Sequence, residues 1–157
     1  MNVELDASDL DGLIRQLEQC PQVLAEAKRR AFEDAASKMK AVVDREVGGA
    51  GRVRSWQEKC VGSYGGYAAV RPQKKTYIET KGKQLGFRTG PKRYAVGHVT
   101  NAINSGHRAP RDKFGERHSS RTVAGKHFYE LASTETARIG REAAEQIVQA
   151  LADHLEG

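Results

Sequence analysis

The chain has 157 residues, of which 38% are apolar and 29% are charged, with a formal net charge of +6. This length predicts one soluble domain over residues 1–157, large enough to bury a core without disulfides. No stretch approaches the roughly 18 consecutive apolar residues of a membrane helix, and the first residues are too acidic for a signal peptide, so no membrane partner is expected. The two cysteines, Cys20 and Cys60, lack a CxxC spacing and are expected to be reduced thiols.

Charge and glycine are distributed unevenly along the chain. Residues 1–50 hold 7 basic and 10 acidic residues, residues 51–126 hold 17 and 4, and residues 127–157 hold 2 and 6. Eleven of the 16 glycines lie between Gly48 and Gly106, which favours strands and turns in the middle of the chain. The sequence therefore predicts helical acidic ends and a basic, non-helical middle.

The first 50 residues predict two helices. Apolar residues recur at helical spacing from Leu10 to Leu17, after a run of side chains that can cap a helix start. Proline is tolerated in the first turn of a helix but not in its interior, so Pro21 predicts a break. A longer helix then runs to about Val47 and ends at the glycine-rich residues 48–51.

The C-terminal part predicts one long helix, from about Lys126 to Leu155, with Gly140 as its weakest position. The middle predicts short strands at Val53–Val61, Tyr67–Arg71 and Thr76–Lys81, and Leu85–Arg88 is a further candidate strand. Tyr94–Asn104 fits either a strand or a short helix closed by Gly106.

The charged residues 106–121 predict an exposed, mobile basic loop, between a sheet region at 51–105 and a C-terminal helix region at 122–157. Amphipathic helices on both sides of the middle need a partner for their apolar faces. A small sheet is the simplest one. The expected fold class is therefore α+β, with N-terminal helices and a long C-terminal helix packed on a small, mainly antiparallel sheet.

The sequence contains no strong catalytic signature. The five histidines lack the spacing of metal ligands, the glycine-rich pieces lack the Walker ending, and no G-x-S-x-G motif occurs. His98, Asn101 and His107 follow the order of an H-N-H nuclease, but their segment does not suggest the required ββ-metal unit. We therefore expect no enzyme activity, no cofactor and no metal.

The basic middle is the strongest candidate for an interaction surface. Aromatic residues lie between its cations, an arrangement that suits nucleic acid because cations bind phosphates and rings stack on bases. The same cations could instead meet the acidic helices of a neighbouring copy, and a head-to-tail contact of this kind makes a ring when it closes. The charge layout favours the subunit contact over DNA. The candidate residues are Arg52, Arg54, Arg71, Lys74, Lys75, Lys92, Arg93, Arg108, Arg111, Lys113, Phe114, Arg117 and Arg121.

Several short segments, in their order along the chain, resemble a family of tailed-bacteriophage proteins. The opening Val3–Leu17 is similar to that family's short strand, polar turn and leucine-containing helix, and Gly51–Ser55 is similar to the start of its first sheet strand. Tyr94-Ala95 followed by Asn104–His107 resembles the family's aromatic-alanine segment that leads to a glycine. Ala124–Phe128 resembles the segment that introduces its last helix.

The family is the head-tail connector or tail-completion (neck) group, described as minor tail protein Z-like. The resemblance implies a structural protein of the virion neck or tail, made in the cytoplasm of the bacterial host. It further implies a ring of copies of the chain, about six if it matches the tail symmetry, that contacts adjacent neck or tail-tube proteins close to the passing DNA. The alternative left open is a basic nucleic-acid-binding protein.

Overall fold

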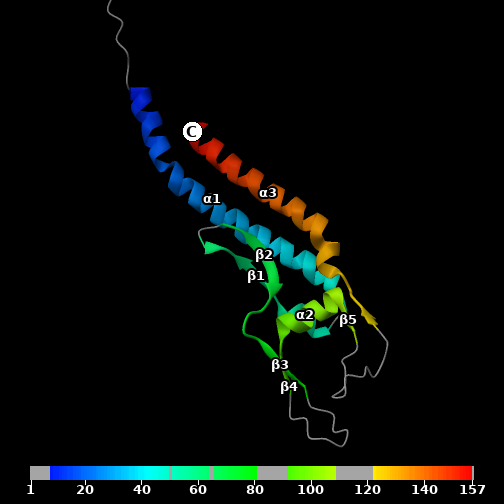
Figure 1. Ribbon diagram of the computed structural model, residues 1–157. Helices are drawn as coiled ribbons and strands as arrows, with labels where there is room; N and C mark the ends of the chain where they lie inside the picture. The colour runs from blue at the N-terminus through cyan, green and yellow to red at the C-terminus, as the bar shows by residue number, and fades with distance from the viewer. Residues whose placement is uncertain (1–7, 50, 64–65, 81–91, 109–121, 157) are drawn as a thin grey trace, which may run out of the picture.

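The computed structural model describes residues 8–49, 51–63, 66–80, 92–108 and 122–156 (Figure 1). Two long helices run side by side, and the short elements gather around one end of this pair. The elements are α1 (Ser8–Val47), η1 (Gly51–Trp56), β1 (Gln57–Val61), β2 (Ala68–Pro72), β3 (Tyr77–Thr80), β4 (Lys92–Ala95), α2 (Val96–Ser105), β5 (Gly106–Arg108), β6 (Thr122–Ala124) and α3 (Phe128–Glu156). The predicted α+β class is confirmed.

Helices α1 and α3 run antiparallel, so that the start of α1 lies beside the end of α3 (Figure 1). One link between them is a hydrogen bond from Arg45 Nη2 to Glu135 Oε2 at 2.5 Å. Near the other end, His154 Nε2 lies 3.0 Å from the carbonyl oxygen of Gln16. The two helices thus bury much of their apolar faces against each other, whereas the sequence predicted that a sheet would be their shared partner.

Helix α1 continues through Pro21, so the predicted break between two helices is wrong. The proline lacks an amide donor and lies on the exposed side of the helix, while α1 contacts α3 before it through Gln16 and after it through the buried Ala31 and Ala35. Contacts with α3 on both sides of Pro21 therefore outweigh a local cost of about 3 kcal/mol. The predicted end at Val47 is confirmed, since Gly48 takes a positive φ of 56° and its amide bonds to Arg45 O at 3.0 Å.

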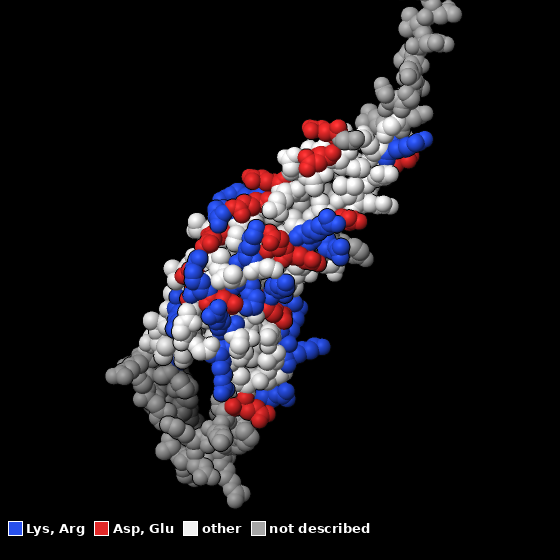
Figure 2. All heavy atoms as spheres, turned by 180° about the vertical axis from the view of Figure 1, so that it is seen from behind, with Lys and Arg blue, Asp and Glu red and all other residues white. Residues whose placement is uncertain are grey.

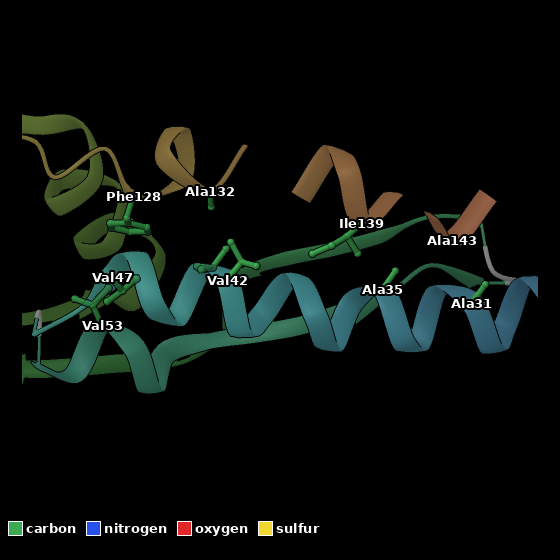
Figure 3. Packing of buried hydrophobic residues seen from close by; sticks show 10 residues of the cluster. Ala31, Ala35, Val42, Val47, Val53, Phe128, Ala132, Ile139 and Ala143 are labelled. Atoms are coloured by element: carbon green, nitrogen blue, oxygen red, sulfur yellow. The ribbon is translucent and has the colours of Figure 1, made fainter. Parts of the chain in front are cut away.

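The core lies mainly between α1 and α3 and extends to η1 (Figure 3). Alanines occupy many of its positions, which lets the two helix backbones approach closely. Phe128 is fully buried at the start of α3, where burial of such a side chain contributes about 1.5–3 kcal/mol. The buried cluster consists of Ala31, Ala35, Val42, Val43, Val47, Val53, Phe128, Ala132, Ile139 and Ala143.

The described strands form three separate two-stranded antiparallel sheets, β1–β2, β3–β4 and β5–β6. In the first, Gln57 pairs with Pro72 and Val61 with Ala68, and this hairpin packs on α1. The predicted strands Tyr67–Arg71 and Thr76–Lys81 are confirmed as β2 and β3. The first four residues of the predicted strand Val53–Val61 instead form the end of η1, because Val53 turns inward and is 2% exposed.

The segment Tyr94–Asn104, which fitted either a strand or a helix, contains part of each. Its first two residues end β4, and the rest form α2, which buries Val96, Thr100 and Asn104 at helical spacing. The first three residues of the predicted loop 106–121 are strand β5, paired with β6. The remainder, residues 109–121, and the possible strand Leu85–Arg88 lie outside the described residues.

Candidate interaction surfaces

The hairpins are joined to the helix pair through the side chain of Asn104, at the end of α2. Its Oδ1 accepts a hydrogen bond from the amide of Tyr129 at 3.1 Å, and its Nδ2 donates to both carboxylate oxygens of Glu130 at 3.1 and 3.2 Å. Its backbone oxygen accepts from the amide of His127 at 2.9 Å. Asn104 is 6% exposed and has partners for its side-chain oxygen, its side-chain nitrogen and its carbonyl, so it fixes α2 on the first turn of α3.

Two further contacts hold the same junction. Tyr129 Oη donates to Gln57 Oε1 at 2.5 Å, and Gln57 Nε2 donates to the carbonyl of Val53 at 3.1 Å, which ties α3 to β1 and η1. Burial raises the pKa of Tyr129 to about 12, so the hydroxyl keeps its proton at neutral pH. A Cβ atom at Gly125 would lie 2.3 Å from Asn104 O, which shows that the backbone after β6 packs directly against the end of α2.

Four of the predicted basic residues lie at one corner of the hairpins, where η1 meets the turn after β2. They are Arg52 and Arg54 in η1 and Lys74 and Lys75 in the turn, all exposed. The turn is held against η1 by Gln73, whose amide donates to Trp56 O at 2.8 Å and whose Nε2 donates to Ser55 O at 3.2 Å. Gln73 thus places Lys74 and Lys75 beside η1, whereas Arg54 Nε lies 3.9 Å from Asp44 Oδ2 of α1.

Two other predicted residues already have partners within the chain. Arg71 in β2 forms a half-buried pair with Glu58, with Nε 3.3 Å from Oε1. Arg93 in β4 lies over the ring of Tyr77 in β3, with its guanidinium carbon 4.2 Å from the ring centre. Tyr77 is 48% exposed, so this cation and ring together face solvent.

The remaining predicted residues are spread more widely. Arg108 is exposed in β5, and Lys92 opens β4. Trp56, one of the rings expected to stack on bases, packs partly buried against the core instead. Five predicted residues lie outside the described part of the chain, namely Arg111, Lys113, Phe114, Arg117 and Arg121.

The fold separates charge between the two ends of the elongated molecule. We call residues 8–27 of α1 and 141–156 of α3 the distal end; they comprise eight acidic and two basic residues. We call residues 51–63, 66–80, 92–108 and 122–126 the hairpin end; they comprise ten basic and two acidic residues. Figure 2 shows acidic side chains near the top of the helix pair, a mixed belt below them, and mostly basic side chains over the hairpins.

The distal end also exposes apolar side chains that the sequence analysis did not propose as a contact surface. Ile14 and Leu17 of α1 are 45% and 52% exposed, and Val148 of α3 is 68% exposed. An open groove of about 490 Å³ lies nearby, lined by residues of both helices that include Gln22, Glu26 and Gln146. The signal that could have found this surface was the apolar face at Leu10–Leu17, because a pair of helices leaves part of such a face uncovered.

No group of three or more His, Cys, Asp or Glu side chains within the described ranges is placed to hold a metal ion. None of the described helices is long and apolar enough to cross a membrane.

Comparison with known proteins gives no match for this chain, whether the comparison is with family models, with curated proteins or with solved structures.

Proposed function

We propose that this chain is a structural protein of a tailed bacteriophage or prophage, located in the neck or tail of the particle. Copies of it assemble into a ring that joins or completes the tail at the head-tail junction, with adjacent neck or tail-tube proteins as further partners. Its role in this proposal is to bind, without substrate or cofactor. The resemblance of the segments at Val3–Leu17, Gly51–Ser55 and Ala124–Phe128 to neck proteins supports this assignment.

The observation that carries the assembly part is the separation of charge between the distal end and the hairpin end. Opposite charges on different surfaces of one molecule attract a second copy head to tail, and this attraction sets both orientation and association rate. A head-to-tail contact uses two different surfaces, so it repeats from copy to copy and closes into a ring if the rotation allows. The distal end also exposes the apolar side chains of Ile14, Leu17 and Val148, and association of copies through this end would bury them.

The proposal is tested by molar mass from light scattering, over a dilution series at low and high salt. We expect a concentration-dependent oligomer that weakens at high salt, because exposed charges are screened beyond about 8–10 Å at 0.1–0.15 M salt. The variant Arg52→Glu/Lys74→Glu reverses two exposed charges at the hairpin end and should dissociate the oligomer. The control Arg29→Glu/Arg141→Glu changes the net charge equally but adds acid to the helix pair, and should leave the oligomer intact. A monomer under all conditions, or equal effects of both variants, contradicts the proposal.

Nucleic-acid binding is the second candidate, favoured by the exposed pair of Arg93 and Tyr77. It predicts that the chain retains duplex DNA, with a log affinity that falls with log salt by about 0.9 per neutralised phosphate. Replacing Lys74, Lys75, Lys92 and Arg93 by Ala should flatten this slope. DNA retention by a monomer would favour this candidate over ring assembly, whereas an unchanged slope would exclude these four residues as its contacts.

A further inference from the structure

A second groove lies between strand β2 and helix α3, with helix α1 beneath it. Its volume is about 350 Å³. Met39 and Val43 of α1 form part of its apolar lining, together with Ala132 and Thr136 of α3 and Ala68 and Val70 of β2. Most of the lining side chains are small, so an extended backbone can approach the walls closely.

The edge of β2 that borders this groove has free backbone groups. The amide of Gln73 bonds to Trp56 O at 2.8 Å, and in an antiparallel pair the residues that bond to the neighbouring strand alternate. Ala68 and Val70 lie an odd number of residues from Gln73, so they belong to the set that does not bond to β1. Their N–H and C=O groups are therefore directed away from β1. Within the described residues, β2 has β1 as its one neighbouring strand, and no backbone hydrogen bond to another element involves Ala68 or Val70.

We propose that residues 2–7 of a second copy of the chain bind in this groove as a third strand beside β2. A two-stranded sheet is marginal alone, and an open edge that flanks an apolar groove is the arrangement into which extended segments add as strands. This inference rests on the proposed assembly of copies and names one contact within it.

The sequence before α1 has the pattern that this groove requires. Val3, Leu5 and Ala7 alternate with polar residues, so in an extended conformation they share one face. That face would pack on Met39 and Val43, while Asn2, Glu4 and Asp6 would face solvent.

The donor is a second copy because a chain cannot place its own residues 2–7 in its own groove. Met39 lies 31 residues after Ser8 in the continuous helix α1, which separates them by about 46 Å. Seven extended residues span at most about 25 Å. The segment therefore falls short of the groove of its own chain by about half the distance.

The test uses the chain with the changes Val3→Asp/Leu5→Asp, so that no copy can fill the groove of another copy with its residues 2–7. A fluorescent peptide with the sequence of residues 1–7 is titrated against it, followed by anisotropy. We expect saturable binding. Adding Ala137→Trp, which fills the groove from an exposed position of α3, should weaken binding at least tenfold, whereas Ala144→Trp, exposed on α3 but outside the groove lining, should not. Absence of peptide binding, or equal effects of the two tryptophans, overturns the proposal.

Molar mass of the same variants separates this inference from the proposed function. In an otherwise unchanged chain, Val3→Asp/Leu5→Asp and Ala137→Trp should each dissociate the oligomer, and Ala144→Trp should leave it intact. An oligomer that survives Val3→Asp/Leu5→Asp overturns the strand contact but leaves ring assembly standing. Loss of the oligomer with Ala137→Trp, without any peptide binding, shows that another segment occupies the groove and also overturns the assignment to residues 2–7. If the unchanged chain never oligomerises, the proposed assembly fails, and this contact between copies fails with it.

Discussion

Asn104 caps helix α3 although it lies 25 residues before the amide that it binds, since its Oδ1 accepts the hydrogen bond from Tyr129 N at 3.1 Å. The residue at the usual capping position is His127, which has a positive φ of 52° and thus not the extended backbone of a normal cap. The cap of α3 is consequently supplied by α2. Formation of the first turn of α3 and docking of the hairpins on the helix pair therefore stabilise each other.

Replacing Asn104 by Ala should destabilise the fold by about 1–3 kcal/mol. The change removes the cap and leaves the amide of Tyr129 without its partner. Urea unfolding followed by circular dichroism measures the loss. Asn101→Ala is the matched control, because Asn101 is exposed in the same helix, and it should change the free energy of unfolding by less than about 0.5 kcal/mol. Equal losses in the two variants would show that Asn104 does not cap α3.

The same variant should raise the pKa of Glu130. Hydrogen bonds from its own backbone amide and from the Asn104 side chain hold this pKa below its ordinary value, because both donors favour the charged carboxylate. The stabilisation is thus present above the ordinary glutamate pKa of about 4.3 and is lost as the pH falls through the lower folded value. Carboxyl chemical shifts over a pH series give the pKa of Glu130. An unchanged pKa in Asn104→Ala would exclude the Asn104 side chain as a cause of the lowered pKa.

The sequence predicted the long elements well because their signals are local. The end of α1 at Val47 and the extent of α3 follow from apolar spacing and from glycines, and both are as expected. The continuity of α1 through Pro21 could not be predicted in the same way. It depends on contacts with α3, more than a hundred residues away, including that of His154 with Gln16.

The candidate interaction residues were predictable as a composition but not as a surface. The run of cations in the middle of the chain is plain in the sequence, yet only the turn held by Gln73 places Lys74 and Lys75 beside η1. The free edge of β2 was not predictable, because it depends on which strands pair. One small sheet was expected, whereas the strands that the structure describes form three separate two-stranded sheets, which have more edges than one sheet would.

Gly125→Ala should disrupt the junction between α2 and α3. The new Cβ would lie 2.3 Å from Asn104 O and 2.6 Å from the carbonyl carbon of Ser105, and backbone atoms cannot move aside as a flexible side chain can. We expect a loss of about 2 kcal/mol or more in the free energy of unfolding, measured in urea. The control is Gly49→Ala, where a Cβ would meet nothing within 4 Å, and it should have little effect. A Gly125→Ala protein as stable as the control would mean that the backbone at Gly125 does not pack this closely against the end of α2.

Gly140→Ala should stabilise the protein, although Gly140 faces α1 in a closely packed helix pair. A Cβ at this position would lie 3.9 Å from the terminal methyl carbon of Met39, which is an ordinary contact and needs no movement of either helix. Alanine favours a helix interior over glycine by about 0.8–1.0 kcal/mol, and thermal unfolding should therefore show a higher midpoint. Gly12→Ala, where nothing lies within 4 Å, reports the gain from helix propensity alone. If Gly140→Ala lowers the midpoint while Gly12→Ala does not, α1 and α3 pack more closely than the distance to Met39 indicates, and Gly140 is needed for that approach.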